Sequence, residues 1–388
     1  RNRTLSGTLI CGPLAQSANR HVQPPLVNRE RCRTTADIDQ LLRSHSCLID
    51  LRAPAEFSKG SIPGAVNLPI LTDDERHSVG VCYREKGQQA AVALGMQLVQ
   101  GAVKDARIDG WQQLLRAYPE AALFCWRGGQ RTGFAAQWLR ERGEQPRQVQ
   151  GGYKALRNRC LQILDADSQR LDWFVLGGRT GVGKTLILQQ LSTGIDLEGF
   201  ARHRGSAFGA TQHPQPTQVD FENQLAVASL QCIAEHSSLV VEDESRTIGK
   251  VALPGSWHQR MQRAPLVLLE AALEQRARHI ADEYIVDPLA QGVAPQLLEA
   301  KHLQAVARIR KRLGGDRYQA AQAAISTGFR SGDHQSWIRL LLNEYYDPMY
   351  DYQLARKQQR VVFRGNAKQV LRWLREAADR GLVQDARG

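Results

Sequence analysis

Short apolar segments alternate with helical repeats through the first 164 residues. Strands are predicted at residues 47–51, 121–124 and 148–150, and apolar side chains at helical spacing follow Thr34 and surround Trp111. Residues 53–69 are rich in turn formers but keep spaced apolar side chains, which predicts an ordered loop packed on the sheet. Strands and helices in this order predict an open α/β sheet, whose ligands bind beyond the carboxyl ends of the strands.

The same alternation returns after a short polar segment at residues 165–170. A strand predicted at residues 173–176 leads into a glycine-rich loop and a helical run at residues 186–191. A further strand at residues 239–244 ends in acids, and beyond Pro265 the pattern is mostly helical. A chain of 388 residues is longer than a single hydrophobic core usually supports, so at least two domains are expected. We therefore predict a flexible extension over residues 1–28, an α/β domain over residues 29–164, and an α/β domain with a mostly helical C-terminal part over residues 165–388.

Composition narrows the choice of partner and compartment. Lys and Arg outnumber Asp and Glu by 51 to 39, a net charge of +12 that favours a polyanionic partner such as nucleic acid. Seven cysteines without a C-x-x-C pair indicate free thiols in a reduced, cytoplasmic compartment. No apolar run reaches the length of a membrane span, so no contact with a membrane is expected. We also expect no tightly bound cofactor and no obligate protein partner.

Cys125 stands at the end of a predicted strand and opens a loop with two glycines and two arginines. A helix follows, with Gly143 at the position of a left-handed C-terminal cap. Backbone N–H groups and guanidiniums would converge on the sulfur or on an anion beside it, which lowers a thiol pKa and makes a nucleophile. The alternative is a buried cysteine that acts as a small hydrophobe. The arginines favour a catalytic Cys125 with an anion loop formed by Arg127, Gly128, Gly129 and Arg131.

A complete G-x-x-x-x-G-K-T motif lies between a strand and a helix in the second predicted domain. Such a loop surrounds phosphates with N–H groups, while its lysine supplies a cation and its threonine can hold Mg²⁺. The predicted phosphate-binding residues are Gly178, Gly181, Gly183, Lys184 and Thr185. Glu242 and Asp243 end the strand at residues 239–244 and resemble the acidic partner that positions Mg²⁺ or a water. The alternative is a strand end with solvated acids.

Two basic segments are candidate contacts to RNA or phosphate. The first mixes acids, bases and glycine in one loop and holds Arg202, His203 and Arg204. The second is a predicted helix with four cations, Arg308, Arg310, Lys311 and Arg312, and a later segment clusters Tyr345, Tyr346, Tyr350 and Tyr352. Cations beside aromatic rings suit RNA phosphates and unpaired bases. The alternative is a charged helix face with a tyrosine packing layer.

Three segments together resemble a rhodanese domain, a family in which the loop cysteine carries transferable sulfur or selenium. They are residues 50–57, the turn at residues 60–67 and the Cys125 loop. Five residues separate Cys125 from Arg131, one more than is typical of sulfur-transferring rhodaneses, and Cys-x5-Arg followed by Ser or Thr is also the phosphatase pattern. The longer loop should cradle a tetrahedral oxyanion. No histidine precedes Cys125 and no nearby Asp suits a general acid, which disfavours a phosphatase.

A rhodanese-like domain joined directly to a P-loop domain closely resembles the bacterial tRNA 2-selenouridine synthase family. Linked motifs in one order carry the resemblance, at residues 79–83, 125–131, 151–155, 196–199, 203–206 and 242–246. The resemblance implies an α/β rhodanese-like domain followed by a P-loop NTPase-like α/β domain. It also implies that selenium from selenophosphate replaces sulfur in the wobble 2-thiouridine of tRNA, after a geranyl group from geranyl diphosphate has been attached to that sulfur.

For the residues of this chain, the resemblance implies two substrate sites. The Cys125 loop, with Arg127 and Arg131, would take selenophosphate, and residues 178–185 would hold the diphosphate without a need for ATP hydrolysis. The sequence leaves open whether selenium bonds to Cys125 or is delivered beside it. It also leaves open a sulfurtransferase or phosphatase regulated by nucleotide binding, and a P-loop kinase or RNA-binding module whose rhodanese-like half is inert.

Overall fold

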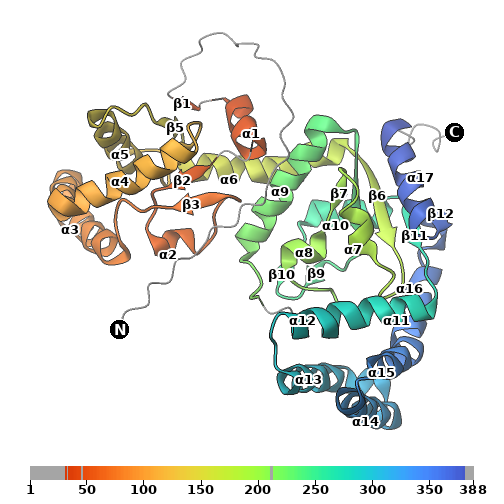
Figure 1. Ribbon diagram of the computed structural model, residues 1–388. Coiled ribbons are helices and arrows are strands. Elements are labelled where there is room, and N and C mark those ends of the chain that lie inside the picture. Colours follow the sequence, from red (N-terminus) through yellow and green to blue (C-terminus); the bar gives the residue numbers. More distant parts are fainter. Residues whose placement is uncertain (1–30, 33, 45–46, 210–212, 381–388) are drawn as a thin grey trace.

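The computed structural model describes residues 31–380 except 33, 45–46 and 210–212, so the predicted extension at residues 1–28 lies outside the described residues. Two lobes follow one another along the chain (Figure 1). Each is built on a five-stranded sheet in which every neighbouring pair is parallel, with helices on both faces. The predicted α/β fold class is confirmed.

The sheet of the first lobe has the strand order β1-β5-β4-β2-β3. Its strands are β1 (Arg31–Cys32), β2 (Leu48–Asp50), β3 (Ala65–Asn67), β4 (Ala122–Phe124) and β5 (Arg147–Val149). Its helices are α1 (Thr35–Arg43), α2 (Pro54–Phe57), α3 (Asp73–Leu98), α4 (Gly101–Ala117), α5 (Gln130–Glu141) and α6 (Gly152–Gln162). The prediction of one loop at residues 53–69 is wrong, because α2 and β3 lie within it. The edge strand β3 is half-exposed and only three residues long, so it leaves no apolar run in the sequence.

Alternation along the strands divides the core of the first lobe. Leu48 and Phe124 face one side, where they pack with α1 and α6. Ile49 and Leu123 face the other side and meet α4 and α5. Gly143 adopts the predicted left-handed conformation after α5, with φ +87°, and its N–H donates to Arg140 O. This cap ends the helix that begins directly after the Cys125 loop.

The sheet of the second lobe has the order β12-β11-β6-β8-β7, with a separate β9-β10 hairpin. Its strands are β6 (Asp172–Gly177), β7 (Gly194–Ile195), β8 (Ser238–Glu242), β9 (Thr247–Ile248), β10 (Val251–Ala252), β11 (Leu266–Leu269) and β12 (Val361–Gly365). Its first helices are α7 (Lys184–Leu188), α8 (Leu197–Ala201), α9 (Gln218–Glu235) and α10 (Gly255–Arg263). The helix after the glycine-rich loop is therefore shorter, and begins earlier, than the predicted run at residues 186–191.

The C-terminal part is mostly helical, as predicted. Its helices are α11 (Leu273–Ala281), α12 (Asp287–Ala290), α13 (Pro295–Leu313), α14 (Gly315–Ser331), α15 (His334–Leu341), α16 (Asp347–Ala355) and α17 (Ala367–Arg380). Single π-helical turns occur at Ile163–Asp167, Asp282–Val286 and Leu342–Tyr346, and 3-10 turns at Ser168–Arg170 and Gln358–Arg360. A separate hydrophobic cluster holds α11 and α13 to α15 together, whereas α17 packs on the sheet of the second lobe.

Helix α9 belongs to the second lobe but packs on the first, against α1 and α6 (Figure 1). One hydrophobic cluster runs without a break from Leu41 and Leu156 in the first lobe to Phe221 in α9. Polar contacts surround it: Arg157 forms an ion pair with Glu222, and Ser61 N donates to Asp220 Oδ1 at 2.8 Å. The lobes therefore share a core rather than meeting through a loose linker.

Candidate functional site

The Cys125 loop leaves the carboxyl end of β4 and is fixed by the start of α6. Tyr153 N donates to Cys125 O at 2.8 Å, and Lys154 N donates to Trp126 O at 3.0 Å. A Cβ added to Gly152 would lie 2.2 Å from Cys125 O, so this close backbone contact requires glycine. The Gly151-Gly152 turn therefore packs directly against the backbone of the cysteine loop and fixes its position, a role that the sequence pattern alone did not reveal.

Both arginines nearest the loop base already have carboxylate partners. Arg131 donates to Glu56 through Nη1 at 2.6 Å and Nη2 at 3.2 Å, and the fully buried Arg52 is held by Asp50. Burial works to lower the pKa of Arg131, but the hydrogen bonds and charge of Glu56 outweigh it and raise that pKa. Cys125 is 3% exposed, while Arg127 is exposed to solvent. Arg131 therefore has a carboxylate partner, whereas Arg127 and the loop N–H groups have none among the described residues. Arg127 and these N–H groups are the predicted anion ligands that can still bind an anion.

An aromatic stack lies beside the cysteine. The Arg52 guanidinium sits 3.8 Å from the Tyr153 ring centroid, and the Trp126 and Tyr153 centroids are 5.5 Å apart. Trp126 is 43% exposed, so one side of its ring is available for stacking. Thr132, in the first turn of α5, is fully buried, and its hydroxyl has no hydrogen-bond partner among the described residues. Sequence reasoning missed both features because neither is visible without the fold.

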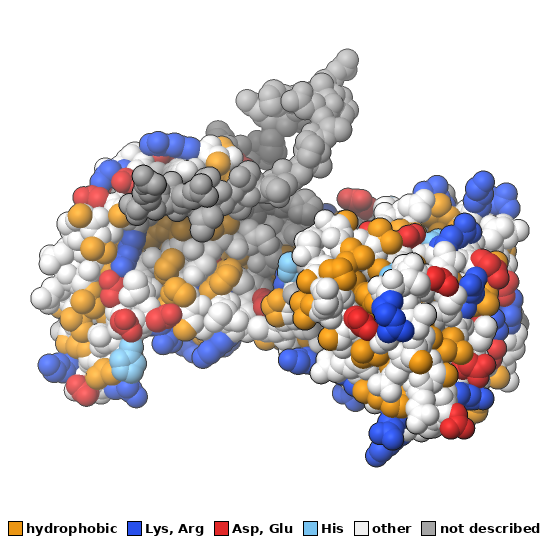
Figure 2. Space-filling view, turned by 60° about the horizontal axis from the view of Figure 1, so that its bottom comes forward, with side chains coloured by type: hydrophobic (Ala, Val, Ile, Leu, Met, Phe, Trp, Pro, Cys, Tyr) orange, Lys and Arg blue, Asp and Glu red, His pale blue; other side chains and the backbone are white. Residues whose placement is uncertain are grey.

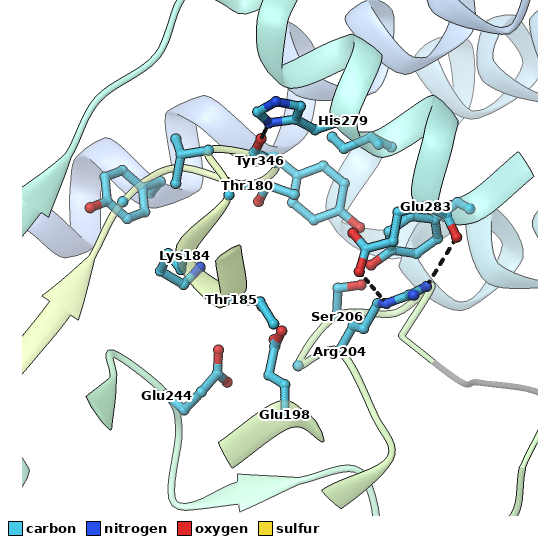
Figure 3. Close-up of a pocket in the computed structure, with 18 of the residues that line it drawn as sticks. Thr180, Lys184, Thr185, Glu198, Arg204, Ser206, Glu244, His279, Glu283 and Tyr346 are labelled. Atoms are coloured by element: carbon cyan, nitrogen blue, oxygen red, sulfur yellow. Dashed lines mark hydrogen bonds and ion pairs between the residues drawn. The ribbon is translucent and has the colours of Figure 1, made fainter. Parts of the chain in front are cut away.

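The glycine-rich loop at residues 178–185, called the P-loop below, borders a cavity of about 660 Å³ (Figure 3). Gly181 and Gly183 have φ of +81° and +88°, and a Cβ on Gly181 would lie 2.8 Å from Arg276 O. Lys184 and Thr185 line this cavity, and Lys184 has no carboxylate within 4 Å among the described residues. The loop thus presents an unpaired cation and N–H groups to one space, as an oxyanion requires.

The two predicted strand-end acids have different surroundings. Glu242 is fully buried, and its Oε2 accepts from Leu197 N at 2.8 Å and from Glu198 N at 3.1 Å. Asp243 accepts twice from Lys357 Nζ, at 2.7 Å each. Glu242 Oε1 is buried without a hydrogen-bond partner among the described residues, and Asp243 lines the P-loop cavity. Neither is a solvated acid, and their role as the acidic partner of the P-loop stays a prediction.

A different carboxyl pair faces the P-loop. Glu198 and Glu244 line the cavity on the side of Lys184 (Figure 3), and a Cβ added to Gly205 would lie 2.7 Å from an oxygen of each. Burial, followed by the charge of Glu244, raises the pKa of Glu198 to about 8, although Lys184 opposes the shift. Burial also raises the pKa of Glu244. Glu198 therefore retains a proton at neutral pH.

The four basic residues predicted as RNA or phosphate contacts near the end of α13 have different surroundings. Arg312 lines the P-loop cavity, and Arg308, one turn earlier, lines an adjoining cavity. The Arg310 guanidinium lies 5.2 Å from the Tyr318 ring centroid, and Lys311 is exposed and lines neither cavity. In Figure 2 the Lys and Arg side chains of the visible face stand singly or in small groups rather than in one broad patch.

The three predicted RNA or phosphate contacts at residues 202–204 also differ in their surroundings. Arg204 lines both cavities and pairs with Glu283 at 2.5 Å. Arg202 is exposed and adopts a left-handed conformation, with φ +48°. Burial, and then the charge of Arg308, lowers the pKa of His203, whose Nδ1 is buried without a partner among the described residues. Tyr345 and Tyr346 are buried packing residues, whereas Tyr352 is 68% exposed.

No described group of three or more His, Cys, Asp or Glu side chains is arranged to hold a metal ion. Within the part of the chain that the structure describes, no helix is both long and apolar enough to cross a membrane.

Comparison with known proteins covers both lobes. Residues 34–159 match the rhodanese-like domain family, and residues 171–380 match the family described as tRNA 2-selenouridine synthase AAA domain. The chain is 46% identical to tRNA 2-selenouridine synthase of Shewanella oneidensis over 357 residues, which cover 88% of this chain and 95% of that protein. It is 45% identical to the proteins of that name from Marinobacter nauticus, over 88% and 97% of the two chains, and Pseudomonas fluorescens, over 89% and 98%. The chain belongs to the tRNA 2-selenouridine synthase family.

Proposed function

We propose that this protein is a tRNA-modifying enzyme that converts wobble 2-thiouridine to 2-selenouridine, with selenophosphate as the selenium donor and an S-geranylated intermediate. The relatives named above are called tRNA 2-selenouridine synthases, and they align with this chain over nearly their whole length. The observation that carries the proposal is the presence, in one chain, of a cysteine loop at a strand end and a separate P-loop cavity. Two such sites suit two chemical steps with two phosphorus-containing substrates.

The first step takes place at the P-loop. The thiocarbonyl sulfur of the base attacks C1 of geranyl diphosphate, an S–C bond forms, the C–O bond to diphosphate breaks, and the base loses its N3 proton. Lys184 and the loop N–H groups hold the departing diphosphate and stabilise its charge. The ion pair of Asp243 with Lys357 supports this function over nucleotide hydrolysis, because that carboxylate is already neutralised by a cation.

The second step takes place at Cys125. Selenium in selenophosphate is already fully reduced, so a perselenide on Cys125 would require an oxidant. We propose instead that the Cys125 thiolate attacks phosphorus, breaks the P–Se bond and releases hydrogen selenide anion. Selenium then bonds to C2 while the C–S bond breaks and geranyl thiol leaves, and water hydrolyses the phosphocysteine. The five-residue spacing from Cys125 to Arg131 suits this phosphoryl transfer.

One incubation tests the proposal. The purified protein is mixed with 2-thiolated tRNA and geranyl diphosphate, with or without selenophosphate. The tRNA is then digested to nucleosides, whose masses are measured by mass spectrometry. We expect S-geranyl-2-thiouridine without selenophosphate and 2-selenouridine with it. Recovery of unchanged 2-thiouridine under both conditions would contradict the proposal, and ATPase activity stimulated by tRNA would favour a nucleotide-driven function.

A further inference from the structure

A second cavity of about 410 Å³ adjoins the P-loop cavity. The two, called the P-loop chamber and the side chamber here, share Arg204, Glu283 and Tyr284 in their linings. The side chamber extends from this boundary toward α13, where Lys301, His302 and Arg308 line it. Adjoining chambers allow two substrates to meet at a common boundary, which a group transfer between them requires.

The side chamber has more cations than carboxylates in its lining. Its cations are Arg204, Lys301 and Arg308, and its acids are Glu283 and Asp287. Arg204 is matched by Glu283, whereas neither Lys301 nor Arg308 has a carboxylate within 4 Å among the described residues. Burial lowers the pKa of Lys301, and the charge of Arg204 lowers it further. An anion placed between Lys301 and Arg308 would stabilise the charged form of Lys301 and so oppose both causes of its lowered pKa.

Aromatic side chains and a neutral acceptor complete the lining. Phe208 and Tyr284 line the chamber and are half-buried, and the Arg204 guanidinium lies 4.7 Å from the Tyr284 ring centroid. His302 Nδ1 lies 2.7 Å from Leu298 O, so this nitrogen donates and Nε2 is left as an acceptor. Burial lowers the pKa of His302 to about 4, which keeps the ring neutral. A neutral acceptor suits the N3–H group of a uracil-type base.

We propose that the side chamber binds the target nucleotide of the RNA, splayed out from its loop, with a backbone phosphate on Lys301 and Arg308 and the base against Phe208 and Tyr284. This inference rests on the proposed function in taking RNA as the substrate. Enzymes that act on a base remove it from the stack, and anticodon-loop bases are single-stranded and can be splayed out. The thiocarbonyl of a nucleotide held there would face the chamber boundary, and the donor diphosphate would lie beyond that boundary, on the P-loop.

The first test measures RNA affinity without any chemical step. A fluorescent anticodon stem-loop is titrated with wild type, Lys301→Ala, Arg308→Ala and Lys311→Ala, since Lys311 lies on the same helix but outside both chambers. We expect roughly tenfold weaker binding for each chamber variant and less than about twofold for Lys311→Ala. The slope of log K against log salt should fall by about 0.7 for each lost phosphate contact. Equal losses in all three variants would overturn the assignment, because they would indicate diffuse charge attraction.

The second test locates the base. A photoreactive 5-iodouridine is placed at the wobble position, cross-linked in the presence of inorganic diphosphate, and mapped by mass spectrometry. We expect attachment within the peptides that contain Phe208 or Tyr284, and cross-links confined to Trp126 would overturn the proposal. Both readouts are independent of product formation. If no selenouridine forms but the binding and cross-linking results are as expected, the proposed chemistry fails and the nucleotide site stands.

Discussion

The Arg131 guanidinium beside Cys125 is held by both carboxylate oxygens of Glu56, at 2.6 and 3.2 Å, across 75 residues of sequence. The pair is largely withdrawn from water, with side-chain exposures of 25% and 13%. Glu56 also accepts from Ala53 N at 3.1 Å, so its carboxylate ties α2 to the start of α5. Arg131 is thus held in place before any substrate arrives, by a carboxylate that also pairs with Arg76 at 3.0 Å.

Glu56→Gln should destabilise the protein by about 1–3 kcal/mol, because it leaves a partly buried guanidinium without its counter-charge. Urea denaturation of the whole chain measures this change. Glu120→Gln is the matched control, since Glu120 pairs with Arg147 but is 67% exposed. We expect less than about 0.5 kcal/mol there, and equal losses in the two variants would refute a special role for the buried pair.

Thr132→Val should separate activity from stability. Its fully buried hydroxyl has no partner among the described residues, so an isosteric methyl group should leave the stability equal or raise it by about 1 kcal/mol. We expect selenium incorporation to slow at least tenfold, on the order of one lost hydrogen bond to the loaded loop. Thr132→Ser keeps the hydroxyl and is the control. Wild-type rates in Thr132→Val would show that the hydroxyl has no role in the reaction.

Cys125→Ser should abolish 2-selenouridine formation and leave S-geranylation intact, because only the second step uses the thiolate. Nucleoside analysis of the tRNA separates the two products, and Cys82→Ser, at a partly exposed position, is the control. The wild-type protein mixed with selenophosphate alone should also gain the mass of one phosphoryl group at Cys125. A gain of selenium without phosphorus would contradict the proposed route.

Lys184→Ala should lower S-geranylation by about 10²–10³-fold, because the cation that balances the leaving diphosphate is lost. The exposed Lys250 provides a control of equal charge. Selenium transfer to tRNA that has been geranylated beforehand should proceed at the wild-type rate in Lys184→Ala. If Lys184→Ala retains S-geranylation, the P-loop is not the site that holds the diphosphate.

The Glu198 and Glu244 pair predicts a stability that falls with pH. Burial raises the pKa of Glu198 from 4.5 to about 8, so the folded protein holds a proton that the unfolded chain releases between these values. This contribution to stability is fully present below about pH 4.5 and is lost as the pH rises through about 8. Glu198→Gln should therefore be more stable than wild type at pH 9, by on the order of 2 kcal/mol, and the difference should shrink toward pH 5. A pH-independent difference in denaturation midpoints would argue against the shared proton.

The sequence predicted what is encoded locally. The P-loop is a contiguous motif, and its lysine and threonine line the cavity as expected. The Cys125 loop also follows a strand and precedes a helix, as the apolar pattern indicated. The roles of these residues in binding and catalysis stay predictions.

Contacts between distant segments could not be predicted. Glu198 lies in α8, and it meets Glu244 because Glu244 directly follows the end of β8, which lies beside α8; the motif pointed to Glu242 and Asp243 instead. The basic run on α13 looked uniform in sequence, but successive helical positions turn its members toward different neighbours. Only the packing of α13 against α14 and the cavities distinguishes Arg308 from Arg310.

The shared core has a consequence for synthesis on the ribosome. The face of the first sheet that carries Phe124 is covered by α1 and α6, and these helices are in turn covered by α9, which ends at Glu235. A nascent chain that has emerged only as far as the end of the rhodanese-like lobe still exposes the apolar side chains of α1 and α6 that α9 covers in the complete protein. The first lobe therefore completes its folding only after more than half of the protein has been translated, and a truncated first lobe should aggregate or recruit a chaperone.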